Sequence, residues 1–210
     1  MARRITGHSV GILAIQDGEG LDREILSFPY TIEANGQRPW ASWRVPMETG
    51  ENGESITATA GRAFSEEIIA EDTSFTFSFV EQNSGSISPV YYVLGRDEKS
   101  NNPEDLHLKT FFLVNFTGEL RTVIYSEQGP RGLEVHGLPV YNELSKLLRL
   151  MNSIGRVRAH ETAVLASVAR LCGDRGMAMH YAASMSQYVE AQVSEEDVKL
   201  VSEYISAHMV

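Results

Sequence analysis

A single helix set among many strands is the sequence feature that most restricts the fold. In the first 140 residues, short apolar runs alternate with turn residues, which is typical of β-strands. We expect strands over residues 10–15, 24–28, 40–45, 75–79, 89–94 and 108–116, with Pro29 and Pro46 ending the second and third of them. A helix is predicted over residues 56–68, because Ser55 can cap it and its apolar residues share one face. This order predicts a layered domain of the α/β or α+β class.

The last third of the chain, from about Pro139, has a helical pattern. Apolar residues recur at helical spacing, and we expect helices over residues 141–152, 160–171, 176–191 and 195–208. Ser194 and Asp197 have the spacing of a capping box at the start of the last helix. The apolar faces of the last two helices need a cover, which either the domain or a second copy of the chain would supply.

Composition and charge restrict the partners. Lys and Arg number 18 against 28 Asp and Glu, so the formal net charge is −10, which disfavours nucleic acid as a major partner. Cys172 is the only cysteine, so an internal disulfide and a cysteine zinc site are excluded, which fits a reducing cytoplasm. No apolar run approaches the roughly 20 residues of a membrane span. We therefore expect a cytoplasmic protein without a membrane partner.

The densest group of carboxylates surrounds the predicted helix 56–68. Glu66 and Glu67 lie about 100° apart around a helix axis, so both can reach one point beside it. Two such carboxylates with a third nearby are what Mg²⁺ needs, with phosphate oxygens and water completing its shell. Arg62 lies four residues before Glu66 and can pair with it. The alternative is that these charges form an ordinary solvated face, as most charged helix faces do.

These residues and the segments around them resemble the loop–helix–loop motif of the Nudix hydrolases. That motif reads Gly, five residues, Glu, seven residues, then Arg-Glu-apolar-any-Glu-Glu-any-Gly-apolar. Five positions match, with seven residues between the first Glu and the Arg: Glu54, Arg62, Phe64, Glu66 and Glu67. The resemblance implies an α/β/α sandwich with a mixed sheet over residues 5–172. Residues 173–210 would form a C-terminal helical extension.

Three positions depart from the motif. Glu48 stands at the first Gly, Ala63 replaces the Glu after the Arg, and Ile69 replaces the second Gly. The family uses the missing Glu as a metal ligand or as the base that acts on water. Position 63 lies four residues before Glu67 on the same helix face, so its loss lowers the expected metal affinity.

The resemblance implies a divergent pyrophosphohydrolase that acts on a nucleoside diphosphate linked to another moiety. Mg²⁺ or Mn²⁺ would be held by Glu54, Glu66 and Glu67, and Arg62 would orient a carboxylate of the motif. Glu127, Glu134 and Glu48 are open alternatives for the missing base. A small nucleotide is the implied substrate, and the family resemblance makes a homodimer reasonable. The alternative is an inactive Nudix-fold nucleotide sensor or protein-interaction module, which the replacement by Ala63 suggests.

The histidines give no sign of a metal site in the sequence. His107, His136 and His160 are scattered and lack zinc-site spacing. We expect surface or helix-capping roles for them.

Overall fold

The computed structural model describes residues 3–16, 23–33, 40–81, 87–129, 132–152, 159–171, 173 and 194–210. The predicted helix over residues 176–191 and Cys172 lie outside these described residues. None of the described helices is long and apolar enough to cross a membrane.

The six predicted strands are found, and so are the predicted helices apart from the one over residues 176–191, together with further strands. The strands are β1 (Arg4–Gln16), β2 (Glu24–Glu33), β3 (Trp40–Arg44), β4 (Met47–Thr49), β5 (Phe75–Phe79), β6 (Tyr91–Arg96), β7 (Asp105–Gly118), β8 (Tyr125–Gly129), β9 (Gly132–His136) and β10 (Val140–Glu143). The helices are α1 (Ile56–Glu67), α2 (Leu144–Asn152), α3 (Ala159–Leu171) and α5 (Glu195–His208). Four of these strands, β4, β8, β9 and β10, were not predicted.

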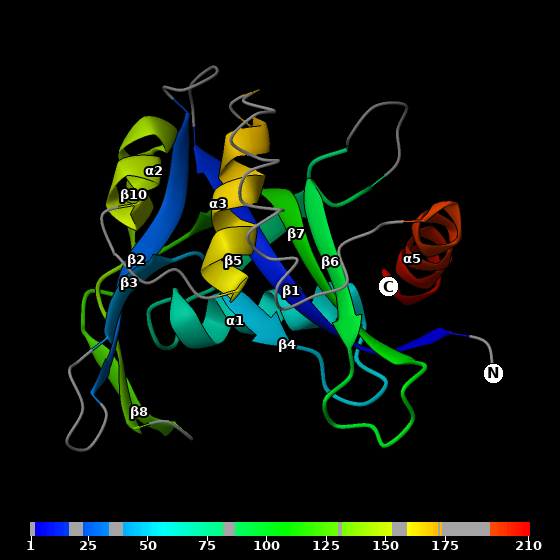
Figure 1. The fold of residues 1–210 in the computed structure, drawn as a ribbon. Coiled ribbons are helices and arrows are strands. Elements are labelled where there is room, and N and C mark those ends of the chain that lie inside the picture. The colour runs from blue at the N-terminus through cyan, green and yellow to red at the C-terminus, as the bar shows by residue number, and fades with distance from the viewer. Residues whose placement is uncertain are drawn as a thin grey trace.

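The described strands form one mixed sheet. Its main path runs β5-β7-β1-β2-β9-β8, and β6, β4, β3 and β10 pair with strands of that path. The long central strands β1 and β7 are parallel, from the pair Arg4 and Asp105 to the pair Ile15 and Asn115. The other strand pairs are antiparallel. The sheet with its surrounding helices can be followed in Figure 1.

Each face of the sheet carries its own hydrophobic core. Successive residues of β1 point to opposite faces, so Ile12 packs in one core and Leu13 in the other. Helix α1 joins the first core through Ala60 and Phe64. Helices α2 and α3 join the second core on the opposite face. The predicted α/β/α sandwich with a mixed sheet is therefore confirmed.

Helix α5 packs onto the domain itself. Val201 and Ile205 are buried in the core that also contains α1, and Val198 stays half exposed. The N-terminus of α5 has the predicted capping box between Ser194 and Asp197. In Figure 1 this helix lies close to the N-terminal end of β1. The domain thus covers the buried face of this helix, while the predicted boundary at residues 172 and 173 stays a prediction.

Several predicted boundaries differ from the structure, and strand pairing explains two of them. Strand β2 continues through Pro29 to Glu33, because Pro29 lies where the strand changes its partner from β10 to β9. On its other edge Pro29 stays in register with Trp43 of β3. The helix predicted from residue 141 begins at Leu144, because residues 140–143 pair with β2 as β10. Pairing with another strand, which local sequence does not reveal, decides both cases.

Candidate functional site

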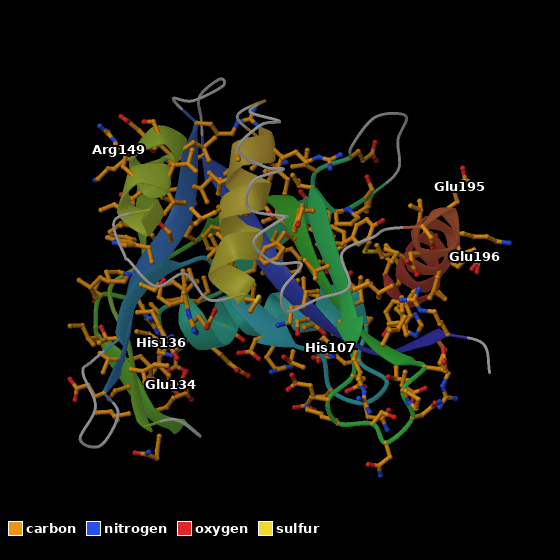
Figure 2. All side chains as sticks on the ribbon, in the orientation of Figure 1. His107, Glu134, His136, Arg149, Glu195 and Glu196 are labelled. Atoms are coloured by element: carbon orange, nitrogen blue, oxygen red, sulfur yellow. The ribbon has the colours of Figure 1, made fainter. Side chains whose placement is uncertain are left out.

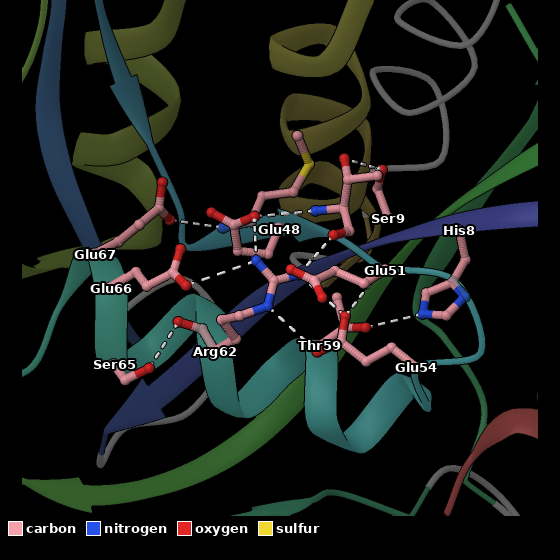
Figure 3. Close-up of polar contacts among 12 residues, drawn as sticks. His8, Ser9, Glu48, Glu51, Glu54, Thr59, Arg62, Ser65, Glu66 and Glu67 are labelled. Atoms are coloured by element: carbon pink, nitrogen blue, oxygen red, sulfur yellow. Dashed lines mark hydrogen bonds and ion pairs between the residues drawn. The ribbon is translucent and has the colours of Figure 1, made fainter. Parts of the chain in front are cut away.

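The predicted loop and helix fold as the sequence suggests. Helix α1 begins after Ser55, whose hydroxyl accepts a hydrogen bond from the Ala58 N–H at 3.1 Å. Gly53 has a φ of 78°, a conformation that favours glycine, and this turn leads directly into Glu54. Strand β4 pairs with β1 and brings Glu48 to the same side of the helix. The loop and the helix thereby bring the carboxylates of the motif around Arg62 (Figure 3).

Arg62 is the centre of this group, which we call the Arg62 cluster: Arg62, Glu48, Glu54 and Glu66. The guanidinium donates two hydrogen bonds to Glu54, at 3.3 and 3.0 Å, and one to Glu48 at 3.1 Å. It also donates to the Thr49 carbonyl at 2.7 Å. Glu66 Oε1 lies 3.7 Å from Arg62 Nη1, and the Glu66 side chain is 51% exposed. The positive charge of Arg62 is therefore shared by three carboxylates.

The charges of the cluster shift its pKa values in two directions. The hydrogen bonds from Arg62 lower the pKa of Glu54 to about 2, and the same bonds raise the pKa of Arg62. Burial raises the pKa of Glu48, and the neighbouring charge of Glu66 adds to the effect. Glu54 is thus firmly ionised at neutral pH, whereas Glu48 is the more basic carboxylate of the pair.

Glu67 occupies a different environment from its neighbour Glu66. Its side chain is only 9% exposed, and Oε2 accepts a hydrogen bond from the Met47 N–H at 2.8 Å. Its other oxygen lies 3.8 Å from Nδ1 of His136 on β9. Burial raises the pKa of Glu67 to about 8. Glu67 therefore connects helix α1 with the β8–β9 hairpin.

Ala63 faces the hydrophobic core rather than water. It is 0% exposed and packs in the same core as Ala60 and Phe64. A glutamate at this position would begin inside that core, on the same helix face as the buried Glu67. The replacement by alanine thus removes a carboxylate and extends the apolar face of α1.

The β8–β9 hairpin carries a second group of polar residues, which we call the hairpin group: Glu127, Glu134 and His136. Glu127 on β8 is directly opposite Glu134 on β9, and His136 follows on the same face of β9. Their ligand atoms lie within 4.8 Å of one another, and no other three His, Cys, Asp or Glu residues do so in the described part of the chain. Glu134 and His136 are labelled side by side in Figure 2.

His136 is a buried histidine, so the predicted surface or helix-capping role is wrong for this residue. Its ring lies among the rings of Phe28, Tyr30 and Tyr125, at centroid distances of 5.5, 5.0 and 5.5 Å. Burial lowers the pKa of His136 to about 4, so the imidazole is neutral at pH 7. His107 is likewise wrong as a helix cap, because it lies in β7 and binds Ser9 Oγ at 2.8 Å. The side chain of His160 is outside the described residues.

The sequence contains one signal for the hairpin group that composition and motif spacing missed. Glu134 and His136 alternate in Glu-Val-His, the period of a strand, and Glu127 precedes them by a hairpin's length. Strand β8 has no apolar residue except Tyr125, so hydrophobic alternation does not reveal this hairpin.

The predicted site residues fall into separate places. Glu54 and Glu66 meet at Arg62, Glu67 lies beside His136, and Glu127 and Glu134 lie together in the hairpin group. Carboxylate oxygens are the ligands that Mg²⁺ prefers, so the box residues fit it by ligand type. Both oxygens of Glu54 already accept from Arg62, which suits a contact through water better than a direct bond. The set Glu54, Glu66 and Glu67 stays a prediction.

Comparison with known proteins gives matches among solved structures alone. No protein-family model and no curated protein matches the chain. The chain is similar to a MutT protein from Bacillus halodurans, with 17% identity, a TM-score of 0.35 and coverage of 69% of this chain and 72% of that chain. It is also similar to an ADP compounds hydrolase, with 17% identity, a TM-score of 0.43 and coverage of 83% and 77%.

A third similar structure comes from Jonesia denitrificans and is described as a possible asymmetric diadenosine tetraphosphate hydrolase. It has 8% identity and a TM-score of 0.45, and the match covers 81% of this chain and 97% of that chain. Because these TM-scores are below 0.5, the fold is assigned from the strand pairing and packing of the chain itself. The chain is therefore an α/β/α sandwich with a Nudix-like loop–helix–loop, and it is similar to solved structures of MutT and Nudix proteins.

Proposed function

We propose that this chain is a divergent, metal-dependent hydrolase of the Nudix type. Its reaction would be cleavage of a phosphoanhydride bond in a nucleoside diphosphate linked to another moiety, with Mg²⁺ or Mn²⁺ as cofactor. The observation that supports this best is the Arg62 cluster, in which one guanidinium holds Glu54, Glu48 and Glu66 at the end of the matching loop and helix. In this arrangement three carboxylates converge on one point, whereas the charges of a solvated helix face would point separately into water.

The residues of the cluster would have different roles. Glu66 and Glu67 would hold the metal, which when bound neutralises phosphate charge and lowers the pKa of a water molecule. Arg62 is fixed by its two hydrogen bonds to Glu54 and would orient Glu66 beside it. Glu54 therefore acts mainly as a positioning residue for Arg62.

Glu48 is the base candidate that the contacts favour. It shares Arg62 with Glu66, and burial raises its pKa, which makes it a better proton acceptor than an exposed carboxylate. Glu127 and Glu134 lie instead with His136 in the hairpin group. The water would lose a proton to Glu48 as its oxygen bonds to the phosphorus, while the bond from phosphorus to the bridging oxygen breaks and that oxygen leaves with the other product.

The test is a turnover assay of the full chain on a panel of nucleoside diphosphate derivatives with Mg²⁺ or Mn²⁺. We expect release of phosphate products, and a fall of about 10- to 100-fold in kcat in both Glu66→Gln and Glu67→Gln. Glu51→Gln is the matched control, because Glu51 is an exposed glutamate of the same loop. Full activity in Glu66→Gln and Glu67→Gln would contradict the assignment of the site.

A nucleotide-binding or protein-interaction module without turnover is the second candidate, and the buried Ala63 favours it. It predicts nucleotide or partner binding with no product at high metal concentration, so turnover that depends on Glu66 would exclude it. Ala63→Glu would restore the motif, and a large gain in activity would identify the natural chain as an impaired enzyme. Thermal unfolding must accompany that assay, because a carboxylate placed in the core lowers stability.

A further inference from the structure

The register of the β8–β9 hairpin sets two glutamates directly against each other. Glu127 and Glu134 are Cα partners in the antiparallel pair, so their side chains leave the same face of the hairpin. Like charges opposite each other on neighbouring strands are destabilising. No lysine or arginine forms an ion pair with either glutamate among the salt bridges of the described residues. A cation bound between the two carboxylates would remove this repulsion.

His136 supplies the second, independent observation. Its side chain is only 4% exposed, yet neither ring nitrogen has a hydrogen-bond partner in the described part of the chain. Buried polar groups are nearly always hydrogen-bonded, so two such nitrogens in one ring require an explanation. Nε2 points toward the hairpin group and lies 3.6 Å from Glu127 Oε1.

This separation suits two ligands of one metal ion. Ligands about 2.1 Å from a tetrahedral ion stand about 3.4 Å apart, close to the distance between His136 Nε2 and Glu127 Oε1. A direct hydrogen bond would be shorter, at about 2.9 Å. The two atoms are thus too far apart to bind each other well and near enough to share an ion.

Neighbouring residues hold the two carboxylates in place. The Tyr30 hydroxyl donates to Glu134 Oε2, and the Tyr125 hydroxyl donates to Glu127 Oε2 at 2.9 Å. In Glu127 the other oxygen is the one that faces His136. Gly129 leaves room for the second oxygen of Glu134, because a Cβ at this position would lie 2.2 Å from it. Such outer contacts are what orients metal ligands in proteins.

From these contacts we propose that Glu127, Glu134 and His136 bind a divalent first-row transition-metal ion. An imidazole with two carboxylates suits Mn²⁺, Co²⁺, Ni²⁺ or Zn²⁺, whereas Mg²⁺ favours ligand sets made of oxygen alone. The Glu127 side chain is 49% exposed, which gives the ion a route from solvent and leaves coordination positions for water. The site goes beyond the proposed function, because its occupation does not require that the chain hydrolyse any substrate.

The test uses the purified full chain with Mn²⁺ alone and no nucleotide. Pulsed electron paramagnetic resonance detects a ¹⁴N nucleus bound to Mn²⁺. Because Glu67 of the proposed catalytic site lies 3.8 Å from His136 Nδ1, Glu67→Gln is measured as well, and an ion held by the hairpin group should keep the signal in that variant. We expect the signal in the wild-type chain and its loss in His136→Gln. Glu127→Gln should raise the Kd of the nitrogen-coupled ion by about 10-fold or more.

Two control variants make the result specific. Glu143→Gln changes an exposed strand glutamate outside the group, and Glu66→Gln changes the Arg62 cluster. Both should leave the nitrogen-coupled Mn²⁺ unchanged. Absence of this species in the wild-type chain, its persistence in His136→Gln, or its loss in Glu66→Gln would each overturn the proposal. If His136→Gln fails to fold, the wild-type signal and the half-exposed Glu127 position decide the question.

Discussion

The Arg62 cluster and the hairpin group balance their negative charge in opposite ways. In the cluster, one guanidinium contacts Glu48, Glu54 and Glu66, with hydrogen bonds to the first two. In the hairpin group, two glutamates face each other, and among the described residues Glu127 has its ion-pair contact with His136, which burial keeps neutral at pH 7. The charges of Arg44 and Arg121 act on His136 from nearby, but neither arginine forms an ion pair with these glutamates in the described part of the chain. The cluster has a counter-charge in direct contact with its carboxylates, whereas the described residues give the hairpin glutamates no arginine or lysine ion pair.

This difference separates two kinds of acidic site. A cluster that contains an arginine is held together by the protein, so a metal there must compete with the guanidinium for the same oxygens. A group whose carboxylates pair with no arginine or lysine gains attraction from a bound ion and loses a repulsion as well. Glu67 lies between the two and links them, with its carboxylate 3.8 Å from His136.

The largest effect on the free energy of unfolding is expected when the positive charge of Arg62 is removed. Arg62→Met would leave three carboxylates without their partner and lower the free energy of unfolding by about 3 kcal/mol. Arg62→Lys should lose less, because it keeps the charge but not the paired hydrogen bonds to Glu54. Urea unfolding at pH 7 measures this, with Arg96→Met at an exposed strand end as the control. A loss no larger than in the control would mean that water, not Arg62, balances these charges.

A smaller effect is expected from Glu67, which links the two groups: the free energy of unfolding should fall by about 2 kcal/mol as the pH rises from 6.5 to 8. The pKa of Glu67 is raised to about 8 in the native chain, against an ordinary value of 4.5, so between these values the native state holds a proton that the unfolded chain has released. Stability should therefore fall as the pH rises from 6.5 to 8, by up to about 1.4 kcal/mol per pH unit. Glu67→Gln should remove this slope in urea unfolding.

The window above pH 6.5 avoids the opposite contribution of His136. Its pKa is lowered from 6.5 to about 4, so the unfolded chain binds the extra proton between these values, and stability rises with pH there. Equal slopes for Glu67→Gln and the wild-type chain between pH 6.5 and 8 would show that Glu67 is ionised in the folded protein, and its link to the hairpin group would then be a charged one.

The smallest effect is expected from Glu127→Gln, and its sign should differ between metal-free and metal-containing solution. In the presence of a chelator, Glu127→Gln should raise the free energy of unfolding by about 0.5 kcal/mol, because it removes the repulsion from Glu134. With Mn²⁺ or Zn²⁺ present the order should reverse, because the wild-type chain then gains stability from the bound ion. Thermal unfolding in the two conditions measures both. If Glu127→Gln instead lowers stability in the presence of the chelator, the charge of Glu127 is already balanced by the protein, as in the Arg62 cluster.

Much of the fold could be predicted because its signals are local. The Ser55 cap, the apolar face of α1 and the capping box at Ser194 depend on residues a few positions apart, and all three are found in the structure. The central strands were recognised by their apolar runs. Strand β8 and strand β10 were missed, because one is polar and the other merges into the start of a helix.

By itself, the sequence determined the layered architecture, the helix with its Ser55 cap, and the pairing of Arg62 with Glu66, because the last two depend on spacing along one short segment. The tertiary structure alone decided that Ala63 faces the core, that Glu67 is buried while Glu66 is half exposed, and that Glu127 meets Glu134 and His136. The physical reason is that burial and strand register depend on which distant segments pack together. A shift of one residue in the β8–β9 pairing would turn Glu127 to the other face and separate it from His136.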